Sequence, residues 1–141
     1  MPRQEDTKVA ISDRLAPITV PCHVFDPGAD DRVPLFRASC TCEIVGIYVV
    51  MSNGVTATTS VFITAQIEDG GSAGSGTTAI ASRGSKTTGF TAETIYEYLT
   101  ASDTPHQLDK GDWVFLDYDE SGTCAPGVIT SNFEIVRGTI D

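Results

Sequence analysis

The chain contains few residues of the types that usually carry out catalysis. Its two histidines are His23 and His106, and neither lies near a nucleophile motif or a residue pattern that would orient a catalytic base. Acid–base catalysis by histidine depends on such a partner. We therefore interpret both histidines as polar surface residues, and we predict no catalytic residue and no enzymatic activity.

Metal binding is also weakly indicated. Asp117, Asp119 and Glu120 lie in the segment DYDES, which lacks the Gly and the terminal Glu that a calcium-binding loop needs. The cysteines show neither the CxxC spacing nor the paired histidines of a zinc site. The sequence therefore predicts solvated carboxylates at a strand end, with no metal and no cofactor.

The cysteines number four, an even count that would indicate disulfides in a secreted chain. The first residues hold no apolar segment of a secretory signal, and no apolar run approaches the ~20 residues of a membrane-spanning helix. We therefore expect synthesis in the host cytoplasm, reduced thiols and no membrane partner. All four thiols are interpreted as small core residues: Cys22, Cys40, Cys42 and Cys124.

The charge of the chain excludes another class of partner. Nine basic and nineteen acidic side chains give a net charge of −10 at pH 7. Nucleic acids bind to clustered Lys and Arg, and no segment concentrates them. Residues 69–76, DGGSAGSG, lack the Lys-Ser/Thr ending of a phosphate-binding loop. We predict no nucleic-acid partner and interpret this segment as an exposed, mobile loop.

The segment that organises the predicted fold is 38–51, ASCTCEIVGIYVVM, which is rich in strand-forming residues. Its first half alternates, with Cys42 and Ile44 on one face and Glu43 on the other. The alternation stops at Gly46, where we expect a bend in the strand. Beyond this glycine the strand is apolar on both faces, and such a strand needs a second covering layer.

That layer is either a second sheet of the same chain or another copy of the protein. The second possibility predicts a homotrimer, or at least an obligate oligomer. Two tyrosines of the segment 90–101 share one strand face and join the predicted interface, because aromatic residues are common at subunit contacts. The predicted interface residues are Val45, Ile47, Val49, Met51, Tyr96 and Tyr98.

The remaining strands follow from alternation and from turn signals. The resulting fold class is all-β, an antiparallel jelly-roll-like β-sandwich of seven or eight strands with a flexible N-terminal arm. Pro21 cannot donate a ladder hydrogen bond and therefore predicts an edge strand. We expect further strands at 17–25, 59–68, 77–82, 90–101, 113–118 and 128–137, and loops or turns at 26–34, 69–76 and 103–111.

Two regions are distinguished: residues 1–16 form the arm and residues 17–141 form the sandwich domain. The arm is polar and mixed in charge, which is typical of a segment that orders only when it binds a partner. It combines basic and aliphatic side chains that would suit a protein surface. The predicted docking residues are Arg3, Lys8, Val9, Ile11, Arg14 and Leu15.

These features together resemble the small capsid decoration (cement) and head-fibre proteins of tailed bacteriophages. The likeness is one of pattern: after the arm come the ASCTCEI strand, the crossing GSAGSGTTAIAS and the strand KGDWVFL, and it covers roughly residues 17–138. Proteins of that kind are often jelly-roll trimers that sit as knobs on the capsid, with an arm on the major capsid protein. The resemblance implies a structural protein on the capsid exterior that stabilises the head.

Two alternatives remain open on the sequence. A carbohydrate- or receptor-binding jelly-roll module would use Tyr96, Tyr98 and Trp113 as a stacking platform for sugar rings. An enzyme on a cupin-like barrel would need a His/Glu metal cluster. Binding of glycans would favour the first alternative, and bound metal the second.

Overall fold

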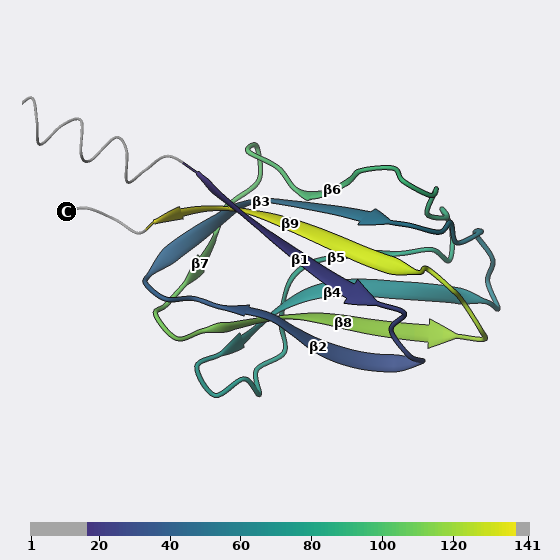
Figure 1. The fold of residues 1–141 in the computed structure, drawn as a ribbon, viewed down its shortest axis with the longest axis horizontal. Coiled ribbons are helices and arrows are strands. Elements are labelled where there is room, and N and C mark those ends of the chain that lie inside the picture. The colour runs from purple at the N-terminus through teal and green to yellow at the C-terminus, as the bar shows by residue number, and fades with distance from the viewer. Residues whose placement is uncertain (1–16, 138–141) are drawn as a thin grey trace, which may run out of the picture.

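The computed structural model describes residues 17–137, which form two antiparallel sheets packed face to face (Figure 1). The described residues contain no helix, and so none long and apolar enough to cross a membrane. The all-β prediction is confirmed. The strands are β1 (Ile18–Phe25), β2 (Asp30–Arg37), β3 (Cys42–Met51), β4 (Phe62–Gly71), β5 (Thr78–Gly84), β6 (Tyr96–Leu99), β7 (His106–Leu108), β8 (Trp113–Ser121) and β9 (Val128–Arg137).

The order of the strands is that of a jelly roll. Sheet A has the order β1-β9-β3-β6, with the short β7 also paired to β3, and sheet B has the order β2-β8-β4-β5. The pairs are nested along the chain: β1 with β9, β2 with β8, β3 with β6 and β7, and β4 with β5. The chain therefore behaves as one long hairpin rolled into a sandwich.

Strand β1 lies at the edge of sheet A and pairs only with β9, as the proline at position 21 predicts. Two strands lie where the sequence predicts loops or turns. Strand β2 begins inside the expected loop 26–34, and β7 lies inside the expected turn 103–111. The described strands consequently number nine, above the predicted seven or eight. Strand β2 accommodates Pro34 because its register with β8 shifts between Pro34 and Phe36.

The core fills the space between the two sheets. On β8, Val114, Leu116 and Tyr118 are fully buried and face sheet A, which confirms the predicted inward face of this strand. The rings of Phe36 and Phe133 meet edge to face across the sheets, with centroids 5.0 Å apart. Full burial of one such aliphatic or aromatic side chain contributes roughly 1.5–3 kcal/mol, so this core is the main source of stability.

A β-bulge in β3 explains the apolar surface on both faces of this strand. The register with β9 shifts between Ile44 and Gly46, at the position where the sequence predicts a bend. Ile44 faces the core before the shift, and Val49 faces it afterwards. A side chain at position 46 would lie 3.0 Å from Tyr48 Cε2 and 3.1 Å from a carboxylate oxygen of Glu134. A larger residue at position 46 would therefore force the side chains of Tyr48 and Glu134 to shift.

The bulge corrects the prediction for three interface residues. Ile47, Val49 and Met51 are 0% exposed in a single chain, because the bulge turns all three towards sheet B. Their cover is thus the second sheet of their own chain, the alternative that the sequence leaves open. They offer no surface to another copy. Val45, at the bulge itself, is half-buried on the outer side of sheet A.

Candidate docking surfaces

The two tyrosines of the predicted interface pack within their own chain. The Tyr96 ring contacts Phe90 edge to face at 5.0 Å, and the Arg83 guanidinium lies 4.3 Å from its centroid. The backbone N–H of Thr91 donates to the Tyr96 hydroxyl at 2.6 Å, and this bond lowers the pKa of Tyr96. Since Arg83 lies on β5 and Tyr96 on β6, the cluster joins the edges of the two sheets.

The other aromatic residues do not complete a sugar-stacking platform. The Tyr98 hydroxyl is buried and has no hydrogen-bond partner among residues 17–137, and burial raises the pKa of this tyrosine. Trp113 is half-buried on β8, close to Gly74 of the β4–β5 connection. The three aromatic side chains are thus divided between the β5–β6 edge and β8. The six predicted docking residues of the arm lie outside the described residues.

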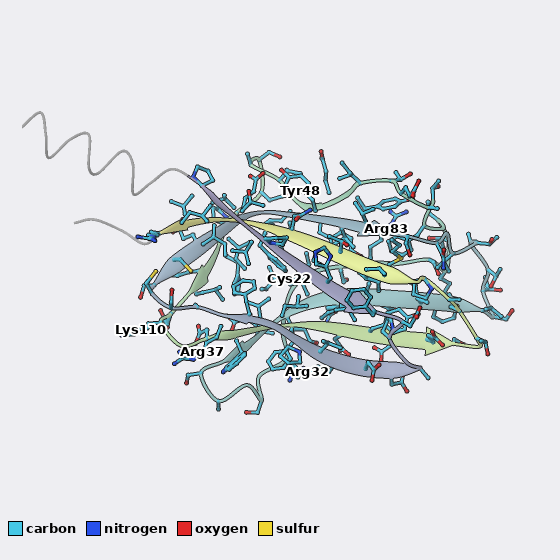
Figure 2. The ribbon with its side chains drawn as sticks, viewed as in Figure 1. Cys22, Arg32, Arg37, Tyr48, Arg83 and Lys110 are labelled. Atoms are coloured by element: carbon cyan, nitrogen blue, oxygen red, sulfur yellow. The ribbon has the colours of Figure 1, made fainter. Side chains whose placement is uncertain are left out.

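The outer face of sheet B carries charged side chains, among them Arg32 on the edge strand β2 (Figure 2). Its Nε donates to Glu68 Oε1 at 2.9 Å, and its Nη1 donates to the carbonyl of Gly74 at 2.9 Å. Its Nη2 donates to the carbonyl of Gly76, and the guanidinium stacks on the Phe115 ring at 3.8 Å. The Gly/Ser-rich loop, exposed at its serines as predicted, is therefore anchored to the sheet at two carbonyls.

Glu68 is the buried partner in this arrangement. Its side chain is 3% exposed, and its second carboxylate oxygen accepts a hydrogen bond of 2.7 Å from Gln66 Nε2. A buried carboxylate is tolerated only when it is paired and hydrogen-bonded. Arg32 and Glu68 are separated by 36 positions along the chain, so the spacing of residues in the sequence gives no signal for this contact.

Two more carboxylates lie beside this pair on β8. Asp117 is opposite Arg32 in the register with β2, and Asp119 is opposite Asp30. Burial, together with the carboxylates of Glu68 and Asp119, raises the pKa of Asp117 to about 6. Burial and the neighbouring Asp30 also raise the pKa of Asp119. The prediction of freely solvated carboxylates in this segment is wrong for Asp117, which is half-buried.

Because the folded-state pKa of Asp117 lies above its unfolded value, the folded state binds this proton more tightly. The contribution of Asp117 to the free energy of unfolding is therefore fully present below the unfolded pKa of 3.8, and it is lost as pH rises from there through about 6. We expect Asp117→Asn to raise the melting temperature at pH 7.5 and to have little effect at pH 4.5. Thermal melts of both proteins at the two pH values test this expectation. A lower melting temperature of the variant at pH 7.5 would contradict it.

His106 has a partner that the sequence does not reveal. Its Nε2 lies 2.8 Å from Asp69 Oδ2, and the other oxygen of Asp69 accepts from the N–H of Gly71 at 2.9 Å. This contact links β7 of sheet A to β4 of sheet B. The interpretation as a polar surface residue fits His23, which is exposed and lies 2.9 Å from Thr130 Oγ1, whereas His106 is half-buried and paired with Asp69.

The cysteines match the core interpretation in part. Cys22 and Cys42 are buried, and Cys40 and Cys124 are half-buried; all four are free thiols. Burial, with a smaller effect of Cys40, raises the pKa of Cys42 to about 11. A thiol with a raised pKa is a poor nucleophile at neutral pH. Within residues 17–137, no group of three or more His, Cys, Asp or Glu side chains is arranged to hold a metal ion.

The outer face of sheet A differs from that of sheet B because it has a groove that contains an aromatic ring. A shallow groove runs across it, and the half-buried ring of Tyr48 lies in this groove with Glu134 on β9 beside it. Glu97 lies opposite Tyr48 on β6. The groove residues are Thr19, Tyr48, Val50, Ile95, Asn132 and Glu134. We call these residues, together with Glu97, the acidic sheet-A face.

Comparisons with known proteins add little to this description. A scan against protein-family models and a search of curated proteins found no match. Among solved structures, the chain is similar to "Structure of infectious bursal disease virus Gx strain", with 18% identity over 88% of this chain and 32% of that chain and a TM-score of 0.30. For "Structure of infectious bursal disease virus Gt strain" the identity is 15% over 86% of this chain and 33% of that chain, with a TM-score of 0.31. The chain thus spans about a third of the length of these chains. Similarity this low establishes no shared function.

Proposed function

We propose that this protein is a structural protein of a bacteriophage particle that binds the outer surface of the capsid as a trimer and stabilises the head. The observation that carries the proposal is that polar side chains of the jelly roll fix its loops and sheet edges. Arg32, Arg83 and His106 each hold a loop or a sheet edge of the sandwich in place. A body braced in this way is suited to bearing load at an interface.

The alternatives that share this fold have less support. Jelly rolls occur in viral capsid proteins, in lectins and in cupins, and the fold alone does not decide among them. A lectin-like role would be favoured by an exposed aromatic platform, but Tyr96 and Tyr98 are half-buried within their own chain. A metal-dependent enzyme would need converging ligands, and no such group is found among residues 17–137.

In the proposed mechanism, each trimer contacts adjacent subunits of the major capsid protein and raises the free energy needed to separate them. The net charge of −10 per chain suits an exterior position better than the DNA-filled interior. The arm, residues 1–16, would order on the capsid through its basic and aliphatic side chains. Three arms per trimer would bind multivalently, so individually weak contacts would add up to stable attachment.

Reversing the charge of the arm tests its role in the full-length chain. We expect Arg3→Glu, Lys8→Glu and Arg14→Glu together to reduce binding to emptied heads of the same phage by roughly 100-fold, because avidity multiplies the loss at each arm. Co-sedimentation of purified protein with the heads measures the binding. Deletion of residues 1–16 should have at least the same effect.

The control variant keeps the six predicted docking residues of the arm, and every other residue of 1–16 is replaced by Gly or Ser. The six are Arg3, Lys8, Val9, Ile11, Arg14 and Leu15. It should bind as the wild type does, and circular dichroism should show an unchanged β-sheet spectrum for every variant. Unchanged binding after deletion would mean that the arm is not the docking element. Failure of the intact protein to bind any head would overturn the capsid role itself.

A further inference from the structure

The basic side chains of the sandwich divide into two groups. Residues 17–137 contain six of them. Three are engaged within the chain: Arg32 with Glu68, Arg83 with the rings of Phe90 and Tyr96, and Lys86 with the ring of Phe62 at 5.2 Å. The other three, which are exposed and lie at one end of the sandwich, are Arg37, Lys110 and Arg137.

Several contacts bring this second group together. Arg37 and Arg137 line the same cavity, of about 200 Å³, at the end of β2 and β9. A side chain at Gly111, the neighbour of Lys110, would lie 3.2 Å from the Arg37 guanidinium, and Figure 2 shows Arg37 and Lys110 at the same end of the molecule. Ile18, which is 44% exposed, and the half-buried Phe36 line the same cavity. We call these five residues the basic end.

The acidic sheet-A face is negatively charged, opposite to the basic end, and like the basic end it also contains apolar side chains. Strands β1, β3 and β6 contain no Lys or Arg, and β9 contains only Arg137 at its last position. Glu97 lies opposite Tyr48 in the register of β3 with β6, and Glu134 lies beside the Tyr48 ring at Gly46. After the larger effect of burial, both carboxylates raise the pKa of Tyr48. Among residues 17–137 neither carboxylate forms a salt bridge. Ile95, on the same face, is 65% exposed.

We propose that a second copy of the chain covers the acidic sheet-A face with its basic end, so that Arg37 and Lys110 of one copy meet Glu97 and Glu134 of the next. Ile18 and Phe36 would pack against Tyr48, Val50 and Ile95. Two acidic sheet-A faces cannot pair with each other, because this would bring like charges together. Contacts between unlike surfaces form a ring when the rotation from one copy to the next closes, and the trimer of the proposed function, on which this inference rests, is such a ring.

Charge reversal at both surfaces tests the pairing in the full-length chain. We expect Glu97→Lys with Glu134→Lys to raise the dissociation constant of the trimer by at least about tenfold, because the contact then joins like charges. Arg37→Glu with Lys110→Glu should have the same effect. The fourfold variant restores opposite charges and should return to within roughly threefold of the wild type. Sedimentation over a concentration series measures all four proteins.

A matched control makes the same change of charge as Glu97→Lys with Glu134→Lys, but on the other sheet. Asp30→Lys with Asp119→Lys lies on the outer face of sheet B and should leave the trimer intact. A wild type that stays monomeric at micromolar concentration, double variants that stay trimeric, or a fourfold variant that is folded but monomeric would each overturn the inference. Binding to heads is measured separately. Trimers that assemble as described but bind no head would contradict the capsid role and leave this contact standing.

Discussion

Replacing Val49 by lysine is expected to unfold the domain rather than to release a folded single subunit. Val49 is 0% exposed and faces sheet B in the middle of the core. A lysine there would bury its charge without a partner or distort the packing around it, and changes of this kind cost more than about 4 kcal/mol. Since a domain of this size is stabilised by only about 5–15 kcal/mol, most of its stability would be lost. Circular dichroism and urea unfolding measure the effect.

Val50 supplies the matched control one position along β3. It is half-buried in the groove on the outer face of sheet A. Val50→Lys should therefore leave the domain folded, with the β-sheet circular dichroism spectrum of the wild type, while it weakens the proposed contact between copies. A Val49→Lys protein that is folded, stable and monomeric would mean that Val49 lies at a contact between copies, in contradiction to the fold described above.

Strand β3 illustrates which structural features the sequence can predict and which it cannot. The sequence predicts a long apolar strand with a bend at Gly46; the strand is present, and its register with β9 shifts at this position. It could not decide whether the extra apolar surface faces solvent, a second sheet or another copy. A shift of one residue moves each side chain to the opposite face of a sheet, and that shift depends on pairing with β9, a strand almost ninety positions away.

The same limit applies to the rest of the fold and to its surfaces. Alternation of apolar and polar residues locates most strands, but β2 is missed because its acidic residues and Pro34 are typical of a loop. The pair His106–Asp69 joins residues 37 positions apart. Contacts of this kind arise only after the nested strands have paired, so neither composition nor spacing could predict them.

Removing the Arg32 side chain is expected to destabilise the protein by about 3 kcal/mol, because the buried carboxylate of Glu68 would lose its ionic partner. We expect the lower end of the range for broken buried ion pairs, since Gln66 still donates to Glu68 and the Arg32 side chain is 28% exposed. For a chain of 141 residues this corresponds to a fall in melting temperature of roughly 10 °C. Calorimetry or urea unfolding of Arg32→Ala measures it.

Two further variants separate the ion pair from the other contacts of Arg32. Arg32→Lys keeps the charge but not the planar fork that reaches Glu68, Gly74 and Gly76 at once, so its loss should be intermediate. Arg32→Met with Glu68→Gln removes both charges and should recover most of the stability, because no unpaired charge is then buried. Increased proteolysis within residues 72–77 in all three variants would show that Arg32 also anchors the loop. A melting temperature of Arg32→Ala within about 2 °C of the wild type would contradict the role assigned to this side chain.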